Sequence, residues 1–172
     1  MRVVCVPGAL ALLPAYASID DPVAELRRAV EEAVAWLVEP GAPVAVYCTP
    51  QSLRLARRLV GNAGGQVHLA EGPPAAVLVI ANGSAKQTEK APGHFDDRAE
   101  AFDAALGQAL RAGDSAALAA IDESLARELW ADVDAFRSLG SDIDLTGADI
   151  EVDYDAAPYG VQYWVVRWLC AR

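Results

Sequence analysis

Residues 75–81, AAVLVIA, decide the fold class of this chain. The segment is apolar throughout; Pro73-Pro74 precede it and Asn82-Gly83-Ser84 follow it. A short, uninterrupted apolar run between such breakers is typical of a strand that is buried on both faces. The sequence therefore predicts a sheet that is covered by helices on both sides.

The first half of the chain alternates further strands with helices. The runs RVVCV (2–6) and PVAVYC (43–48) predict two more strands, and QVHLA (66–70) predicts a short one. Apolar residues at intervals of three and four predict helices over 22–39, capped by the preceding aspartate, and over 49–62. Strands that alternate with helices indicate a mostly parallel sheet.

The second half begins with helices. An apolar stripe from Phe95 to Leu110 predicts a helix that ends at Gly113. Asp114 is expected to cap a short helix, and Asp122 is expected to cap another that carries an apolar stripe over 125–136.

The chain ends in two runs that predict a hairpin. They are DIEVDY (149–154) and VQYWVVRWL (161–169), joined by a turn at Pro158-Tyr159-Gly160. We expect a single α/β domain over residues 1–172, with a mostly parallel central sheet, helices on both faces and the hairpin at one edge.

Composition narrows the classes of partner. The chain has 172 residues, with 24 acidic and 14 basic side chains and a net charge of −10. We expect no nucleic-acid partner and no membrane partner, because phosphate binding needs clustered basic residues and a membrane span needs about 20 apolar residues. Arg54, Arg57 and Arg58 lie on one predicted helix, which we interpret as a solvated face.

The N-terminal residues 1–17 have some features of a secretory signal, including an apolar run and a final A-x-A pattern. Pro7, Gly8 and Pro14 interrupt that run. We therefore expect a first strand followed by a loop.

The cysteines indicate a reducing compartment. Cys5, Cys48 and Cys170 are far apart and odd in number, and the chain has no C-x-x-C pair. Reduced thiols are expected, and with them a cytoplasmic location.

The loop over 82–97 holds most of the functional groups that follow a predicted strand. Ligands in open α/β sheets bind beyond the carboxyl ends of the strands. Glu89 is a candidate base, Lys90 its charge partner and His94 a proton carrier near neutral pH. The competing interpretation is that His94 only precedes a helix start, and that Glu89 and Lys90 are solvated charges.

The histidines do not predict a metal site. His68 and His94 are the only two, and their spacing matches no compact ligand pattern. Ser84 also lacks the G-x-S-x-G context of a nucleophilic serine.

Two blocks of the sequence are similar to a known family. They are VIANGSAKQTEKAPGHFDDRAEAFDAALGQALRAGDSAALAAID (79–122) and DYDAAPYGVQYWVVRW (153–168). The chain resembles the subunit-B-like class III extradiol ring-cleavage dioxygenases of actinobacteria, which are related to the protocatechuate-cleaving β-subunit and to the Memo-like proteins. The resemblance implies an α/β sheet between helices, and Fe(II) at the rim of that sheet in the active members.

The same resemblance shows what this chain lacks. In the family, two histidines and a glutamate bind the iron, and the first of these follows the first strand in a His-Pro-Pro motif. Here that place reads VPGALALLP, and no histidine occurs before Gly65. The acid–base histidine of the family follows a serine, where this chain has Ser84-Ala85. We therefore expect no iron cofactor and no ring cleavage.

The leading hypothesis is a dioxygenase-like domain that binds a small molecule or a partner at the rim of the sheet. The residues expected to contact it are Asn82, Ser84, Thr88 and Tyr159. Two enzymatic alternatives remain: a metal-independent hydrolase or lyase that uses Glu89, Lys90 and His94, and an extradiol dioxygenase-type enzyme with a non-standard metal site.

A third alternative is a structural interaction protein. Trp164 and Trp168 lie on the last predicted strand, where an aromatic face could pack in a homodimer. We slightly prefer the opposite interpretation, in which both tryptophans pack against the protein's own helices.

Overall fold

The segment that decides the fold class becomes β4 (Ala76–Ile80), and all five of its residues are buried. The computed structural model describes residues 1–12, 21, 23–39, 42–68 and 74–171. Predictions that fall on Pro14, Pro22, Pro40, Pro73 and residues 69–70 lie outside this part. In the sheet, β4 lies between β2 (Pro43–Tyr47) and β1 (Arg2–Val6), parallel to both.

The complete sheet has the strand order β3-β2-β4-β1-β6-β5. The short strand β3 (Gln66–Val67) continues the parallel part. At the other edge, β5 (Asp149–Ala156) and β6 (Tyr163–Leu169) form an antiparallel hairpin, and β6 is antiparallel to β1. The turn between them contains a short 3-10 helix, η3 (Pro158–Gly160). The predicted α/β fold with its C-terminal hairpin is confirmed.

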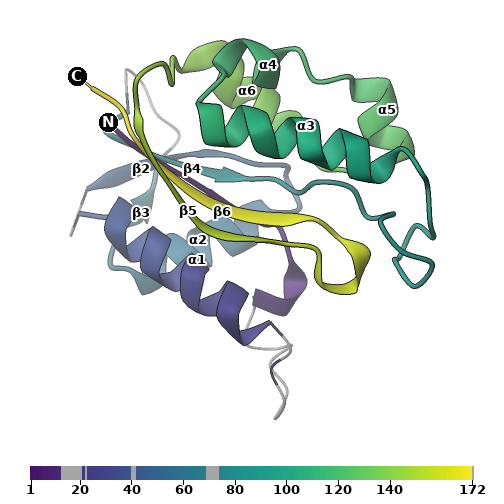
Figure 1. Cartoon of the computed structure of the whole chain (residues 1–172). Coiled ribbons are helices and arrows are strands. Elements are labelled where there is room, and N and C mark those ends of the chain that lie inside the picture. Colours follow the sequence, from purple (N-terminus) through teal and green to yellow (C-terminus); the bar gives the residue numbers. More distant parts are fainter. Residues whose placement is uncertain (13–20, 22, 40–41, 69–73, 172) are drawn as a thin grey trace.

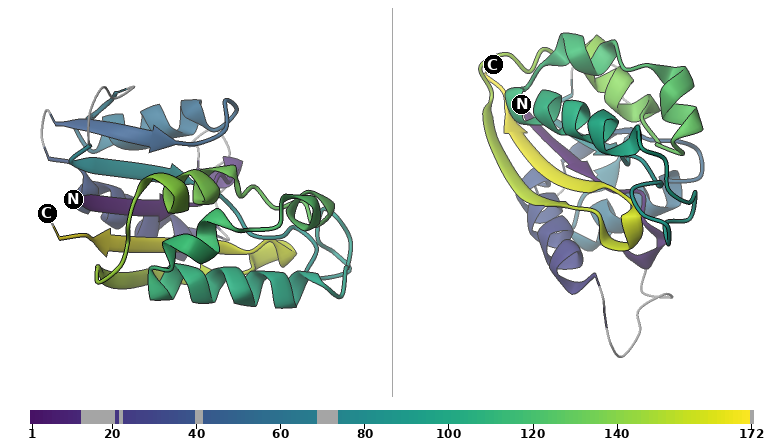
Figure 2. Two further views of the ribbon diagram at one scale, coloured as in Figure 1. Left: turned by 90° about the horizontal axis from the view of Figure 1, so that it is seen from above. Right: turned by 45° about the vertical axis from the view of Figure 1, so that its right-hand side comes forward.

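Helices cover both faces of this sheet (Figures 1 and 2). One face carries α1 (Ala24–Leu37) and α2 (Leu53–Asn62), together with the 3-10 helix η1 (Leu10–Leu12) that follows β1. The other face carries four helices: α3 (Ala99–Ala112), α4 (Ser115–Ala119), α5 (Glu123–Glu128) and α6 (Asp134–Asp142).

Alternation along each strand supplies both cores. On β1, Val4 and Val6 pack with the α1 and α2 side, whereas Val3 and Cys5 pack with the α3 to α6 side. Because successive strand residues point to opposite faces, a continuous apolar run is needed to fill both layers.

The two tryptophans of β6 belong to the core. Trp164 is 2% exposed and Trp168 is fully buried. The indole N–H of Trp168 donates to the Leu110 carbonyl at 3.1 Å, and Trp164 meets the ring of Phe136 edge to face. Both side chains pack against helices of their own chain, so neither supplies a face for a homodimer.

The predicted caps at Asp114 and Asp122 and the predicted end at Gly113 are confirmed. The carboxylates of Asp114 and Asp122 accept backbone N–H groups from the first turns of α4 and α5, and Gly113 ends α3 in the left-handed conformation at φ 61°. The predicted cap at Asp21 was wrong, because Val23 precedes α1 and no side chain that the structure describes caps the helix; the Asp21 carboxylate accepts the Val23 amide at 3.1 Å instead.

Three helix predictions were wrong in extent. The helix predicted over 49–62 begins only at Leu53. The helix predicted from Phe95 begins only at Ala99, and Phe95 is 54% exposed. The helix predicted after Asp122 is broken between α5 and α6, because the Leu129 carbonyl accepts the Ala85 amide instead of continuing a helical ladder. Long-range pairing with the loop after β4 therefore overrides the local apolar period.

Within the described residues, no helix combines the length and the apolar character that crossing a membrane would take.

Two helical glycines allow a test of the packing between α4 and α6. A β-carbon on Gly140 would collide with the backbone of Ser115 and Ala119, whereas one on Gly61 would meet nothing within 4 Å. We expect Gly140→Ala to lower the free energy of unfolding by roughly 1–3 kcal/mol through overpacking. Gly61→Ala should raise it by roughly 0.5–1 kcal/mol. Urea denaturation measures both, and an equal effect of the two substitutions would contradict the close contact.

Candidate functional site

The carboxyl ends of β1, β2 and β4 lie side by side at one end of the sheet, on the right in Figure 1. From there the chain leaves β1 toward the α1 face, and it leaves β4 toward the α3 face. Such a divergence between neighbouring strands is where open α/β sheets bind ligands. The candidate site therefore lies between the loops that follow these three strands.

Hydrogen bonds connect these loops to one another. The Gly8 amide donates to Asn82 Oδ1 at 2.9 Å, and the Asn82 amide donates to the Asp132 carbonyl at 2.9 Å. A β-carbon on Gly8 would lie 3.3 Å from the Ser52 hydroxyl, so the loop after β2 also lies close. The side-chain oxygen of Asn82, a predicted ligand contact, is thus bonded within the protein.

The donor groups at this edge do not fit a non-haem iron centre. Burial raises the pKa of the Cys48 thiol, and the charge of Asp132 adds to that shift. Because the thiolate is the ligand form, such a thiol is a poor ligand. Across the described part of the chain, no three His, Cys, Asp or Glu side chains are grouped so that they could hold a metal ion. Two imidazoles and a carboxylate are what Fe(II) needs at such a site.

A buried carboxylate holds the loop after β4 against α3. Asp103, on α3, is 4% exposed and accepts three hydrogen bonds. The Ser84 amide donates to it at 2.7 Å, the Ser84 hydroxyl donates to its other oxygen, and Gln87 Nε2 donates at 2.8 Å. Burial raises the pKa of Asp103, against the effect of these hydrogen bonds. Ser84 is fully buried, and its hydroxyl fixes the loop to α3.

The same hydrogen bonds continue into the C-terminal hairpin. Gln87 Nε2 also donates to Gln162 Oε1 at 3.1 Å, and Gln162 Nε2 donates to Asp155 at 2.8 Å. Asp155 in turn forms an ion pair with Arg111 of α3. We call Ser84, Gln87, Asp103 and Gln162 the buried polar network; the exposed Asp155 and Arg111 extend it to the surface. It ties together the loop after β4, helix α3 and the hairpin.

Gly83 is required by this network. A β-carbon there would lie 2.5 Å from the Asp103 carboxylate and 2.8 Å from both Gln162 and Trp164. The glycine that follows the strand therefore serves the close approach of the loop to its own core.

The network was missed in the sequence, although one signal was present. Asp103 lies between Ala99 and Leu106 on the buried side of α3, so it is a charged residue on an apolar stripe. A charge at such a position indicates buried partners. Nothing local identified Gln162, some 60 positions away, as one of them.

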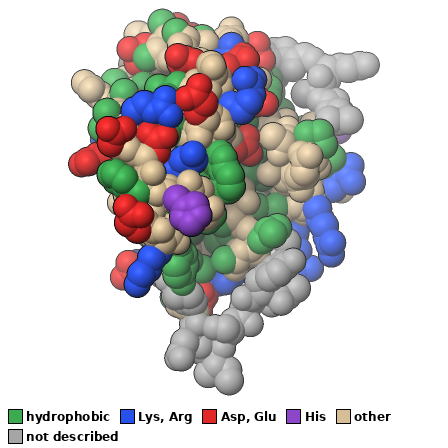
Figure 3. All heavy atoms as spheres, turned by 90° about the vertical axis from the view of Figure 1, so that its right-hand side faces the viewer, with side chains coloured by type: hydrophobic (Ala, Val, Ile, Leu, Met, Phe, Trp, Pro, Cys, Tyr) green, Lys and Arg blue, Asp and Glu red, His purple; other side chains and the backbone are tan. Residues whose placement is uncertain are grey.

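Exposed side chains lie on the loop after β4 and on the neighbouring turns at 130 and 159. We name Lys86, His94, Phe95, Trp130 and Tyr159 the aromatic rim. Phe95, Trp130 and Tyr159 are 54%, 59% and 60% exposed, and Lys86 Nζ lies 5.8 Å from the centre of the Trp130 ring. Figure 3 shows this end of the molecule, where acidic, basic, histidine and hydrophobic side chains are interspersed.

Three members of the aromatic rim have left-handed backbone conformations. His94, Trp130 and Tyr159 have φ values of 58°, 57° and 61°. Such conformations cost about 1–3 kcal/mol each for non-glycine residues and persist only where the surroundings enforce them. Backbone hydrogen bonds do so here: Ala85 bonds to Leu129 at 3.0 Å, and Gln87 bonds to Gly160 at 3.1 Å.

The remaining predicted site residues lie on the surface of the same loop. Glu89, Lys90 and His94 are exposed, and no hydrogen bond or ion pair joins them within the described structure. Thr88 is exposed too, and its hydroxyl lies close to Gly160, next to Tyr159. The structure thus brings Thr88 and Tyr159 to neighbouring positions and leaves the three candidate catalytic residues unconnected.

Comparison of the chain with protein-family models and with curated proteins found no match. The resemblance to extradiol dioxygenases stays a prediction from the sequence.

The raised pKa of Asp103 predicts a pH-dependent stability. The folded state binds this proton more tightly than the unfolded state, whose pKa is near 3.8. The contribution of Asp103 therefore falls as pH rises from about 4 through the raised pKa. Asp103→Asn removes this titration, so its destabilisation should be largest near pH 4 and should shrink toward about pH 7.

Urea denaturation at several pH values measures this difference. Asp97→Asn, at an exposed position just before α3, controls for the change in net charge. A destabilisation by Asp103→Asn that grows with pH would contradict the raised pKa.

Proposed function

We propose that this chain is a dioxygenase-like α/β domain that lacks ring-cleavage activity and binds a small ligand at the carboxyl end of its sheet. One observation carries the proposal. Where the family would hold iron, the Gly8 amide and the Asn82 side chain are hydrogen-bonded to each other at 2.9 Å. The three cysteines are free within the described residues, which fits a cytoplasmic location.

The loss of ring cleavage is supported at two positions. Gly8 has no side chain to offer a metal. Ala85 stands where the family has its acid–base histidine; it is 9% exposed, and its amide donates to the Leu129 carbonyl at 3.0 Å. A methyl group at that position can neither donate nor accept a proton.

A binding role is supported by the aromatic rim. Exposed tryptophan and tyrosine side chains supply large contact areas with few rotatable bonds. The buried polar network fixes the loop beneath them, so little conformational entropy is lost when a ligand contacts the rim. Lys86 beside Trp130 adds a positive charge, which favours a planar ligand with an anionic group.

The alternative of a metal-independent hydrolase or lyase has less support. A general base must lie within hydrogen-bonding reach of the group that it serves, and catalytic partners are normally held by one another. Glu89, Lys90 and His94 share no such contact in the described structure. We therefore do not propose that reaction class.

Metal content and oxygen consumption test the loss of ring cleavage. The purified protein, before and after anaerobic incubation with Fe(II), should contain no stoichiometric iron by elemental analysis. It should consume no oxygen when 3,4-dihydroxybenzoate is added, because the donor set lacks paired imidazoles. Stoichiometric iron that is lost on substitution of His68 or His94, together with oxygen uptake, would overturn the proposal.

The four indole N–H signals provide a second test, by nuclear magnetic resonance. We expect 3,4-dihydroxybenzoate to shift the signal of Trp130 and to leave those of the buried Trp164 and Trp168 unchanged. Trp130→Leu and Tyr159→Ala should each weaken binding by up to about tenfold, the loss of one aromatic contact. Leu169→Ala removes an exposed apolar side chain at the opposite end of the sheet and should have no effect.

A further inference from the structure

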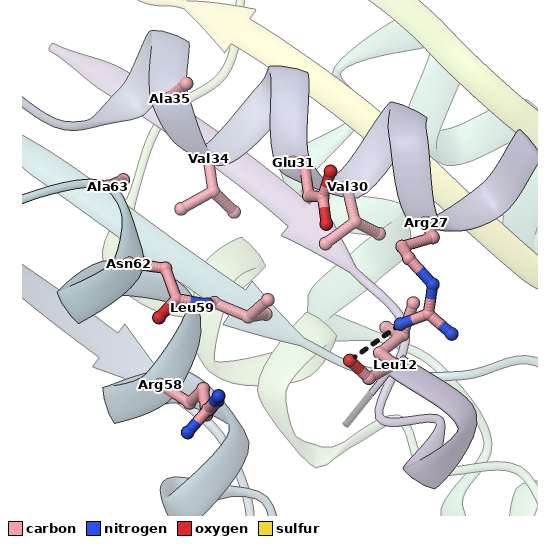
Figure 4. Close-up of a pocket in the computed structure, with 10 residues that line it drawn as sticks. All are labelled: Leu12, Arg27, Val30, Glu31, Val34, Ala35, Arg58, Leu59, Asn62 and Ala63. Carbon is pink, nitrogen blue, oxygen red and sulfur yellow. Dashed lines mark hydrogen bonds between the residues drawn. The ribbon is translucent and has the colours of Figure 1, made fainter. Parts of the chain in front are cut away.

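A cavity lies in the groove between α1 and α2 (Figure 4). Its volume is about 430 Å³. Pockets of roughly 300–1,000 Å³ are typical of small-molecule sites. The residues that line it are Leu12, Arg27, Val30, Glu31, Val34, Ala35, Arg58, Leu59, Asn62 and Ala63.

The floor of the groove is apolar and rigid. Val30 and Val34 of α1 and Leu59 of α2 are each at most 9% exposed and belong to the core on this face of the sheet. The floor of the groove is therefore apolar and closely packed, and Ala35 adds an exposed methyl group beside it.

One charged residue of the groove is already used by the fold. Arg27 Nε forms an ion pair with Asp21 at 2.8 Å. Its other nitrogens donate to the carbonyl groups of Leu12 at 3.0 Å and Ala11 at 2.6 Å. Arg27 thus attaches η1 to α1 and is not free for a ligand.

Two other charged residues line the groove, one on each helix, and form no ion pair with each other in the described structure. Glu31 lies on α1 and Arg58 lies on α2, on opposite walls of the apolar floor (Figure 4). Neither makes an ion pair with any residue that the structure describes. The neighbouring Arg28 and Glu32, in contrast, pair with each other at 3.7 Å. Asn62 adds an amide beside Arg58.

We propose that this groove binds an apolar amino acid, or another zwitterion of that size and polarity. Its carboxylate would be bound by Arg58 with help from Asn62, and its ammonium by Glu31. Its apolar side chain would lie over the floor of the groove, against Leu59 and the exposed Ala35. A guanidinium and a carboxylate are the side chains that form the strongest hydrogen bonds with those two ligand charges.

The charge pattern selects this class over simpler ligands. A purely apolar molecule would bury the floor but leave both charges without partners. A molecule with only an anionic group would place its charge opposite Glu31 with nothing to offset the repulsion. A ligand with both charges satisfies both walls, and this site is independent of the function proposed for the rim.

Three related probes test the proposal in the full-length protein: L-phenylalanine, 3-phenylpropionate without the ammonium, and 2-phenylethylamine without the carboxylate. Titrations followed by ¹H–¹⁵N correlation spectra should show L-phenylalanine shifting the amide signals of Val30, Val34 and Leu59. Each single-charge probe should bind about tenfold more weakly, the loss of one charged hydrogen bond.

Substitutions then assign each charge to its wall. Glu31→Gln should weaken L-phenylalanine and 2-phenylethylamine but not 3-phenylpropionate, and Arg58→Gln should do the reverse for the two analogues. Both positions are exposed, so the fold should be retained. Arg57→Gln is the matched control, because Arg57 is the preceding residue on α2 and does not line the groove.

Three results would overturn the proposal. They are an absence of shifts at the groove amides with L-phenylalanine, equal affinity for all three probes, and equal weakening by Arg57→Gln and Arg58→Gln. The last result would mean that α2 attracts anions only through its overall charge.

Discussion

The carboxylate of Asp103 is the contact on which the carboxyl end of this sheet depends. It is 4% exposed, and a charge buried in that way is tolerated only when hydrogen-bond donors surround it. Two of its three donors come from Ser84 and the third from Gln87, so one side chain of α3 fixes the start of a long loop. Removing a partner from such a group costs far more than forming the bond gains. The left-handed conformations of His94, Trp130 and Tyr159 can persist because backbone hydrogen bonds to the loop after β4 fix the segments that carry them.

This dependence gives the polar block after β4 a structural explanation. The sequence suggested the start of an active-site loop, because serine, glycine and asparagine follow a strand there. In the structure, Gly83 permits the approach of Asp103, Ser84 bonds to it, and Asn82 bonds to Gly8. The fold itself therefore needs these residues, whatever the rim binds. What remains free to contact a ligand is the set of exposed side chains above them.

The sequence predicted the elements well and the connections between them poorly. Strand β4 and the caps at Asp114 and Asp122 follow from local patterns of apolar and capping residues. The break at Trp130 could not be predicted, because it depends on Leu129 pairing with a loop more than 40 positions away. For the same reason Ser84 was expected at a ligand and lies fully buried, whereas Tyr159 and Thr88 lie exposed at neighbouring positions. A sequence shows which residues are polar, but only the tertiary structure shows which polar groups already have partners.

Part of the negative charge of the chain lies on the edge strand β5. This strand carries four acidic residues. Arg167, which also packs over the Trp36 ring, pairs with Glu151 and Asp153, and Arg111 pairs with Asp155. Like charges along an exposed edge disfavour pairing with the same strand of a second copy. On α2, in contrast, Arg54, Arg57 and Arg58 make no ion pair within the described structure, in a chain whose net charge is −10. Of these three, Arg58 lines the groove between α1 and α2, so its positive charge lies beside an apolar floor.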